Sequence, residues 1–215
     1  MKKLVLYGAG GFGRETAAII EDINKNKQTY ELVGFLDDGT KFKKGDLING
    51  YPFLGGKEWI LEHKDEVYCT CTIGNAKIKA EIQRHLTKQG VIFETIIADS
   101  CRICNYSEIG QGCVFYRNVG VSVNCKIGDG VLINSGCSIG HDTVIGNYTT
   151  IMSSTGISGG CIIGDEVSIG GHAFIIPGKK IGKYATVAAG SIVFTNVREG
   201  TVVLGNPAKR MKELE

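Results

Sequence analysis

Residues 133–151 read INSGCSIGHDTVIGNYTTI, with isoleucine at positions 133, 139, 145 and 151. The same six-residue spacing of large apolar side chains continues in both directions, from Ile97 to Val193, and glycine often follows directly. Four positions after each of these anchors the residue is small or β-branched, with Lys179 as the exception. A period of six held over this length matches neither a helix nor the simple alternation of a strand.

This repeat predicts a parallel β-helix, in which each hexapeptide supplies one short strand and one corner. Three hexapeptides complete a triangular coil, so residues 18 apart stack at the sheet spacing of roughly 4.8 Å. The segment is long enough for about five coils, each covering the apolar face of its neighbour. A β-sandwich is the alternative, but its turns would recur every 8–12 residues rather than at a strict six.

The first part of the chain has a different pattern. An apolar strand at 4–7 runs into the sequence GAGGFG at 8–13, and a helix and a second strand at 32–36 follow, ending in Asp37 and Asp38. A glycine turn between a strand and a helix allows a ligand to approach closely and favours phosphate at the helix N-terminus. A full dinucleotide fold needs two such halves, and only about 95 residues precede the repeat. We therefore do not expect NAD.

The remaining N-terminal elements are expected in the order loop, turn, helix, strand, helix and strand. Their ranges are 40–50, 51–56, 57–63, 66–73, 76–89 and 91–93. We expect a Rossmann-like α/β unit over residues 1–95 and an all-β parallel β-helix over residues 96–215. The tail after the last repeat is the candidate cap that a solenoid needs at an exposed end.

Composition narrows the function classes. Lys and Arg number 24 against 22 Asp and Glu, so the chain lacks the basic excess typical of proteins that bind nucleic acid. No apolar run approaches the ~20 residues needed to span a membrane, and the start lacks a signal-peptide core. We expect a cytoplasmic protein without nucleic-acid or membrane partners. Most of the eight cysteines occupy the small-residue column, and no pair of C-x-x-C motifs suggests zinc. We therefore expect structural thiols and no metal.

A truncated Rossmann-like unit followed by hexapeptide coils resembles the bacterial sugar O- and N-acyltransferases with a left-handed β-helix. The resemblance is closest to the nucleotide-sugar 4-amino N-acetyltransferases, with sialic acid O-acetyltransferases as more distant relatives. The matching segments are 8–13, 35–38, 73–75, 139–146 and 205–210. The resemblance implies left-handed coils, acetyl-CoA as co-substrate, and a homotrimer with active sites between subunits.

The resemblance also implies roles for individual residues. His141 would be the general base and Asp142 would orient it, in the manner of a catalytic triad. The nucleotide-linked sugar would contact Gly10, Gly11, Phe12, Asp37, Asp38, Gly74 and Asn134. Acetyl-CoA would lie near Thr150, Gly159, Gly171 and Ala189, and its phosphates near Lys179, Lys180, Lys183, Lys209 and Arg210. Thr150 stands where many relatives carry a second histidine. His172 would line the coenzyme cleft, and the alternative is a structural or solvated role.

We therefore expect an acetyl-CoA-dependent N-acetyltransferase acting on the 4-amino group of a UDP- or dTDP-linked 4-amino-4,6-dideoxy sugar in bacterial surface-glycan biosynthesis. O-acetylation of a sialic acid or related sugar is the alternative enzyme activity. A non-catalytic β-helix with a nucleotide-sensing unit is a third hypothesis, and a role dependent on NAD is the weakest.

Overall fold

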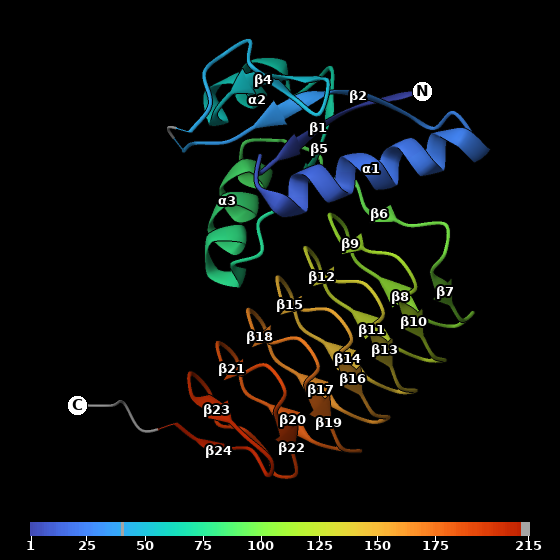
Figure 1. Cartoon of the computed structure of the whole chain (residues 1–215), viewed down its shortest axis with the longest axis vertical. Helices are drawn as coiled ribbons and strands as arrows, with labels where there is room; N and C mark the ends of the chain where they lie inside the picture. Colours follow the sequence, from blue (N-terminus) through green and yellow to red (C-terminus); the bar gives the residue numbers. More distant parts are fainter. Residues whose placement is uncertain (40, 212–215) are drawn as a thin grey trace.

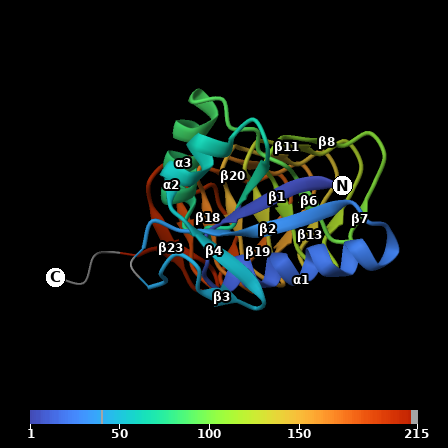
Figure 2. The same ribbon diagram turned by 90° about the horizontal axis from the view of Figure 1, so that it is seen from above.

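The computed structural model describes residues 1–39 and 41–211. An α/β unit lies at one end of a long prism of stacked coils (Figure 1). Seen from above, this unit covers the end of the prism (Figure 2). Its elements are β1 (Lys2–Tyr7), α1 (Gly11–Asn26), β2 (Tyr30–Leu36), β3 (Leu47–Ile48), β4 (Tyr51–Gly55), α2 (Lys57–His63), β5 (Tyr68–Cys71) and α3 (Ala76–Lys88).

The N-terminal sheet has the strand order β3-β4-β2-β1-β5. Strands β2, β1 and β5 are parallel, as expected; β4 is a further parallel strand, and β3 is an antiparallel edge. The chain crosses from one side of β1 to the other between β2 and β5, so the carboxyl ends of β1 and β5 form the switch point where α/β sheets bind ligands. The glycine turn at 8–13 begins there.

Two expectations for this unit were wrong. Residues 47–55 form a hairpin rather than a loop and a turn, with Asn49 and Gly50 both at positive φ in its two-residue turn. The dipeptide Asn-Gly is the sequence signal for this turn, because both central residues must be left-handed. Residues 91–93 make only a single bridge, from Phe93 to Cys69, instead of a strand.

The repeat forms three parallel sheets, one for each face of the prism. The first face consists of β6 (Ile96–Ile97), β9 (Val114–Phe115), β12 (Leu132–Ile133), β15 (Thr150–Ile151), β18 (Ser168–Ile169), β21 (Thr186–Val187) and β23 (Val202–Leu204). The second face consists of β7 (Arg102–Ile103), β10 (Gly120–Val121), β13 (Ser138–Ile139), β16 (Gly156–Ile157), β19 (Phe174–Ile175) and β22 (Ile192–Val193). The third face consists of β8 (Glu108–Ile109), β11 (Lys126–Ile127), β14 (Val144–Ile145), β17 (Ile162–Ile163) and β20 (Lys180–Ile181).

The pairing register is 18 residues, which confirms the predicted coil. Ile139 pairs with Val121 on one side and with Ile157 on the other. The anchors from Phe115 onwards are almost completely buried and form one continuous core with the small residues of the second column. After β21, β23 continues the first face, and β24 (Lys209–Arg210) pairs with it in antiparallel fashion, so the tail closes this edge.

Every corner from 106 to 190 turns through one residue at positive φ, three positions after the anchor. Glycine and asparagine tolerate this left-handed conformation well, but Asp142, Tyr148, Glu166 and His172 also adopt it. We call the corner between the first and second faces the first corner. The second corner joins the second and third faces, and the third corner joins the third and first.

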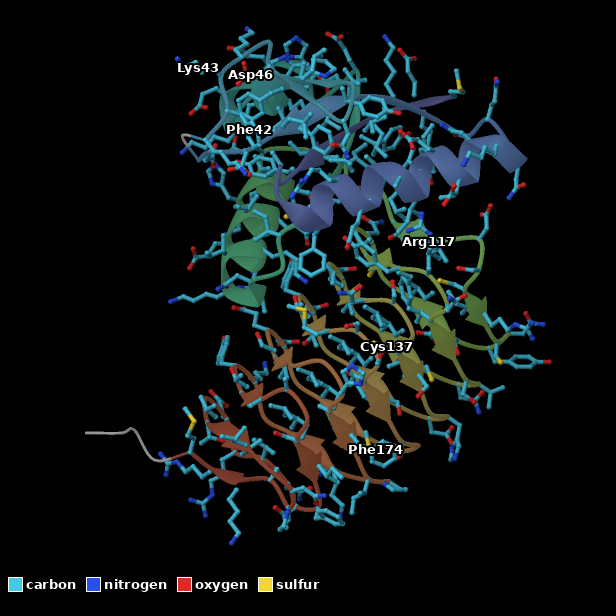
Figure 3. All side chains as sticks on the ribbon, viewed as in Figure 1. Phe42, Lys43, Asp46, Arg117, Cys137 and Phe174 are labelled. Atoms are coloured by element: carbon cyan, nitrogen blue, oxygen red, sulfur yellow. The ribbon has the colours of Figure 1, made fainter. Side chains whose placement is uncertain are left out.

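Helices α1 and α3 attach the N-terminal unit to the coils. Under α1, the buried hydroxyl of Tyr116 donates to the Phe12 carbonyl at 3.0 Å. Arg117 points from the coils up toward α1 (Figure 3) and pairs with Asp22 at 2.6 Å. Helix α3 lies beside the first face (Figure 1), where Arg84 pairs with Glu166 on the third corner at 2.5 Å. The two parts therefore share polar contacts at both helices.

No helix among residues 1–39 and 41–211 has the length and apolar character required to cross a bilayer. All eight cysteines are free thiols.

Candidate functional site

His141 and Asp142 lie on the second corner, between β13 and β14. The imidazole Nδ1 lies 2.7 Å from Asp142 Oδ2, and both side chains are exposed. Asp142 has a left-handed backbone conformation, with a φ of 58°. Its carboxylate lies against the imidazole of the preceding residue, His141. A residue pair that is adjacent in sequence thus forms the ion-pair geometry of a base and its orienting acid.

The coils above and below hold this pair in place. Asn124, one coil above, donates to Asp142 Oδ1 at 3.3 Å. Gly159, one coil below, lies directly under the imidazole: a Cβ at this position would stand 2.5 Å from Nε2 and 2.7 Å from Cε1. Glycine at 159 therefore leaves the space that the His141 ring occupies.

The hydrogen bonds fix the protonation pattern. The bond from His141, followed by that from Asn124, lowers the pKa of Asp142 below its usual value. Because the ionised carboxylate can only accept, Nδ1 must donate to it. The lone pair of the neutral imidazole is then on Nε2, so this atom can take a proton from a substrate.

A second cluster of predicted residues lies at the carboxyl end of β1. Helix α1 starts there without a side-chain cap and without an acidic residue in its first turn. A Cβ at Gly10 or Gly11 would meet no atom within 4 Å, so the space over this helix terminus is open. The terminus of a 16-residue helix with its first N–H groups uncapped favours a phosphate.

Phe12 and Gly74 come together at the switch point. The Phe12 ring lies against Gly74, where a Cβ would stand 2.5 Å from Phe12 Cε2. The ring also packs against Tyr116 of the coils, with centroids 5.7 Å apart. The aromatic side chain thus fills the crevice between β1 and β5, and a ligand has to lie outside it, over Gly10 and Gly11.

Asp37 and Asp38 both bind neighbouring protein groups. Asp37 accepts from the Ala9 and Gly39 amides at 2.9 and 2.8 Å. Asp38 accepts from the Tyr7 hydroxyl at 2.5 Å and from the first amide of α2 at 3.0 Å. Burial, reinforced by the bond to Asp38, raises the pKa of Tyr7. Asp38 also borders a cavity of about 220 Å³, further lined by Tyr7, Lys57, Glu81 and His85.

Six of the remaining predicted residues lie on two corners. Asn134, Gly171, His172 and Ala189 lie on the first corner, because they follow first-face strands. His141 and Gly159 lie on the second corner, as does Lys179, two coils below His141. The second face separates the two groups within one chain. His141 and His172 therefore cannot meet within one chain.

Thr150 lies outside both groups, contrary to its predicted place beside acetyl-CoA. It belongs to the first face under α3, is 1% exposed, and accepts a hydrogen bond from Lys79 Nζ at 2.8 Å. A hydroxyl that is buried in this way cannot reach a thioester at the surface of this chain. We therefore leave Thr150 out of the candidate site.

Lys79 was not predicted from the sequence, because neighbouring lysines on α3 make it read as a surface residue. It is completely buried between α3 and the first face and also donates to the Thr149 carbonyl at 3.2 Å. Burial lowers its pKa to about 7.

Among the basic residues predicted to bind phosphates, Lys183 pairs with Asp165 at 3.0 Å. Lys209 and Arg210 line a cavity of about 350 Å³ at the tail, together with Arg198.

Two family models match the chain. Residues 3–86 match the PglD N-terminal domain, and residues 124–159 and 142–177 match the bacterial transferase hexapeptide (six repeats). None of the curated proteins matches the sequence significantly.

Three solved structures share the fold over essentially the whole chain. The acetyltransferase domain of PglB from Neisseria gonorrhoeae FA1090 is 26% identical, with a TM-score of 0.88 over 98% of this chain and 100% of that one. It was also solved with acetyl coenzyme A. WeeI from Acinetobacter baumannii AYE is 28% identical, with a TM-score of 0.86 over 98% of this chain and 100% of that one.

PerB from Caulobacter crescentus, in complex with CoA and GDP-perosamine, is 22% identical, with a TM-score of 0.87 over 99% of this chain and 98% of that one. At this identity the likeness concerns the fold. The matches confirm the predicted fold class, an α/β unit followed by a left-handed parallel β-helix of hexapeptide repeats.

Proposed function

We propose that this chain, which combines a PglD-type N-terminal domain with bacterial transferase hexapeptide repeats, transfers acetyl from acetyl-CoA to the 4-amino group of a nucleotide-linked 4-amino-4,6-dideoxy sugar. The observation that carries this proposal is the His141–Asp142 pair, exposed on the second corner with Nε2 directed away from the carboxylate. A general base of this kind is what an amine nucleophile requires.

The reaction proceeds by direct attack. The neutral amine attacks the thioester carbonyl carbon, and His141 Nε2 takes the proton that the nitrogen loses as the bond forms. The C–S bond then breaks, and the departing thiolate takes the proton from the imidazolium. Asp142 keeps Nδ1 protonated and stabilises the transient positive charge.

The second corner offers a path for acetyl-CoA. The amide of Gly159 has no hydrogen-bond partner within residues 1–39 and 41–211, so it can donate to the thioester oxygen as negative charge develops. Below it, Gly160 and Gly178 keep the corner narrow, and Lys179 provides positive charge at the same corner. PglB, which shares this fold at 26% identity, was solved with acetyl coenzyme A.

The N-terminal unit supplies the other half of the site. The uncapped start of α1 at Gly10 and Gly11 suits the diphosphate of a nucleotide sugar. The cavity beside Asp38 can receive the base or ribose. Tyr116 contacts the glycine turn through Phe12, and Asn134 lies one coil below Tyr116. A sugar that extends from the start of α1 toward the coils would therefore pass Asn134.

One chain cannot complete this site, because Asn134 and His141 lie on opposite edges of the second face. A closed ring of copies brings the first corner of one subunit against the second corner of the next. The two residues lie on successive corners and hence at nearly the same height along the prism. Exposed Phe174 on the second face, and Val144 and Ile162 on the third, provide apolar surface for such contacts. We therefore propose a homotrimer with shared active sites.

The first experiment measures thiol release from acetyl-CoA over UDP-, dTDP- and GDP-linked amino sugars, with sialic acid as the contrasting acceptor. His141→Ala should lower kcat with the preferred amino sugar by about 10²- to 10⁴-fold. His63→Ala is the matched control, since His63 stacks on Trp59 in α2, far from the coils. Unchanged turnover in His141→Ala would refute the base, and turnover with sialic acid alone would favour O-acetylation.

The second experiment tests the shared site by mixing two inactive variants. After His141→Ala and Asn134→Ala are unfolded together and refolded, one interface in four should combine an intact first corner with an intact second corner. Activity should therefore recover to about a quarter of the wild-type value. If each site lies within one chain, the mixture stays as inactive as its components.

A further inference from the structure

Val123 occupies the position directly above His141 on the second corner, 18 residues earlier in the chain. Its carbonyl accepts the Asp142 amide at 3.0 Å, so the two coils are bonded at this point. The side chain is 39% exposed. A branched apolar group therefore stands at the surface within one coil spacing, roughly 4.8 Å, of the proposed base.

The two sides of His141 differ in chemistry. Below it, the imidazole lies over Gly159, and the corner continues through glycines to Lys179. Basic side chains gather further down at the tail, with Arg198, Lys209 and Arg210. Above it lie Val123 and the N-terminal unit with the open start of α1. The anionic coenzyme thus belongs below the base, and the acceptor sugar above.

We infer that Val123 is a specificity-determining residue that packs against the C6 methyl group of the acceptor sugar. This inference rests on the proposed function. In a 4-amino-4,6-dideoxy sugar, the amine on C4 and the methyl group on C5 are substituents of neighbouring ring carbons. A side chain next to the base is therefore placed to contact the methyl group while Nε2 faces the amine.

The chemistry of Val123 selects against a C6 hydroxyl. In a sugar with an ordinary hydroxymethyl group, that hydroxyl would lie against the valine methyl groups, which offer no hydrogen bond in exchange for water. Contact with a single added or missing group of this size changes kcat/KM by about 10- to 100-fold. The wild-type protein should therefore favour the 6-deoxy sugar by about 10-fold or more.

The test compares two nucleotide-linked 4-amino sugars that differ only at C6, one with a methyl and one with a hydroxymethyl group. The readout is the ratio of their kcat/KM values in thiol release. Val123→Ser should bring the ratio to within about 3-fold of unity. Val123→Thr, which keeps the shape of the side chain but adds a hydroxyl, should also lower the ratio. Ile92→Ser is the control, since Ile92 is also an exposed apolar side chain, at 55%, but lies in the segment between α3 and the first coil. It should keep the wild-type ratio.

A wild-type ratio near one, or a ratio that neither Val123 variant changes, overturns the inference while leaving the acetyltransferase intact. Absence of thiol release from the wild-type protein with every amino sugar would overturn the proposed function itself. A lowered ratio in both Val123 variants, with Ile92→Ser unchanged, supports the role of Val123.

Discussion

Replacing Gly159 by alanine should damage catalysis and leave the fold intact. The new Cβ would stand 2.5 Å from His141 Nε2, whereas ordinary contact begins at 3.4 Å, so the ring must withdraw by about 0.9 Å. His141 is exposed and can move, so the stability cost is small. The movement, however, takes Nε2 away from its position and disturbs the 2.7 Å bond to Asp142. A misplacement of about 1 Å costs on the order of 10²-fold in rate.

The assay is kcat for thiol release at saturating acetyl-CoA and amino sugar, with thermal unfolding as the check of the fold. Gly120→Ala is the matched control, because a Cβ at this second-face glycine meets nothing within 4 Å. Neither glycine has a positive φ, so alanine is conformationally tolerated at both positions. A Gly159→Ala protein that keeps kcat within about 2-fold of wild type would show that the ring does not depend on this space.

Three further substitutions test other parts of the structure. Asp142→Asn should lower kcat by about 10²-fold or more in steady-state kinetics, because it removes the carboxylate that holds Nδ1. Lys79 is neutral in the folded protein above pH 7 but protonated up to about 10.5 when unfolded, so it makes stability rise with pH across this window. Lys79→Met should remove up to about 4 kcal/mol of that rise in denaturation at pH 7 and 10, whereas Lys77→Met, at an exposed site on the same helix, should retain it. Tyr116→Phe should lower the free energy of unfolding by about 1–3 kcal/mol in urea titrations, because its buried hydroxyl bonds Phe12 and Thr16.

The coils were predictable because each anchor repeats one structural position. An isoleucine every six residues leaves a single arrangement that buries all of them, and the 18-residue register follows from three faces per coil. The left-handed corner column was not recognised, since Tyr148, Glu166 and His172 interrupt its glycines and asparagines. The hairpin at 47–55 was missed although Asn49-Gly50 signals it, because its first strand has only two residues.

The candidate site was predictable where its parts are adjacent in sequence or related by the repeat. The neighbours His141 and Asp142 form a pair as expected, although their catalytic role remains a prediction. The burial of Thr150 was not predictable, because it depends on the docking of α3, whose Lys79 is 71 residues away in the chain. The same contact explains why a lysine in a polar helix is buried.

The stacking of equivalent coils makes the prism act as a ruler. The position of each group along the axis of the prism depends only on the number of 18-residue coils before it. The distance between the glycine turn and His141 can therefore change only in steps of one coil, roughly 4.8 Å. Duplicating 18 residues between Tyr116 and Asn134 would lower the base by one such step while preserving every kind of local contact. The distance between diphosphate and amine in an acceptable substrate is therefore set in whole coils, by the number of coils between the N-terminal unit and His141.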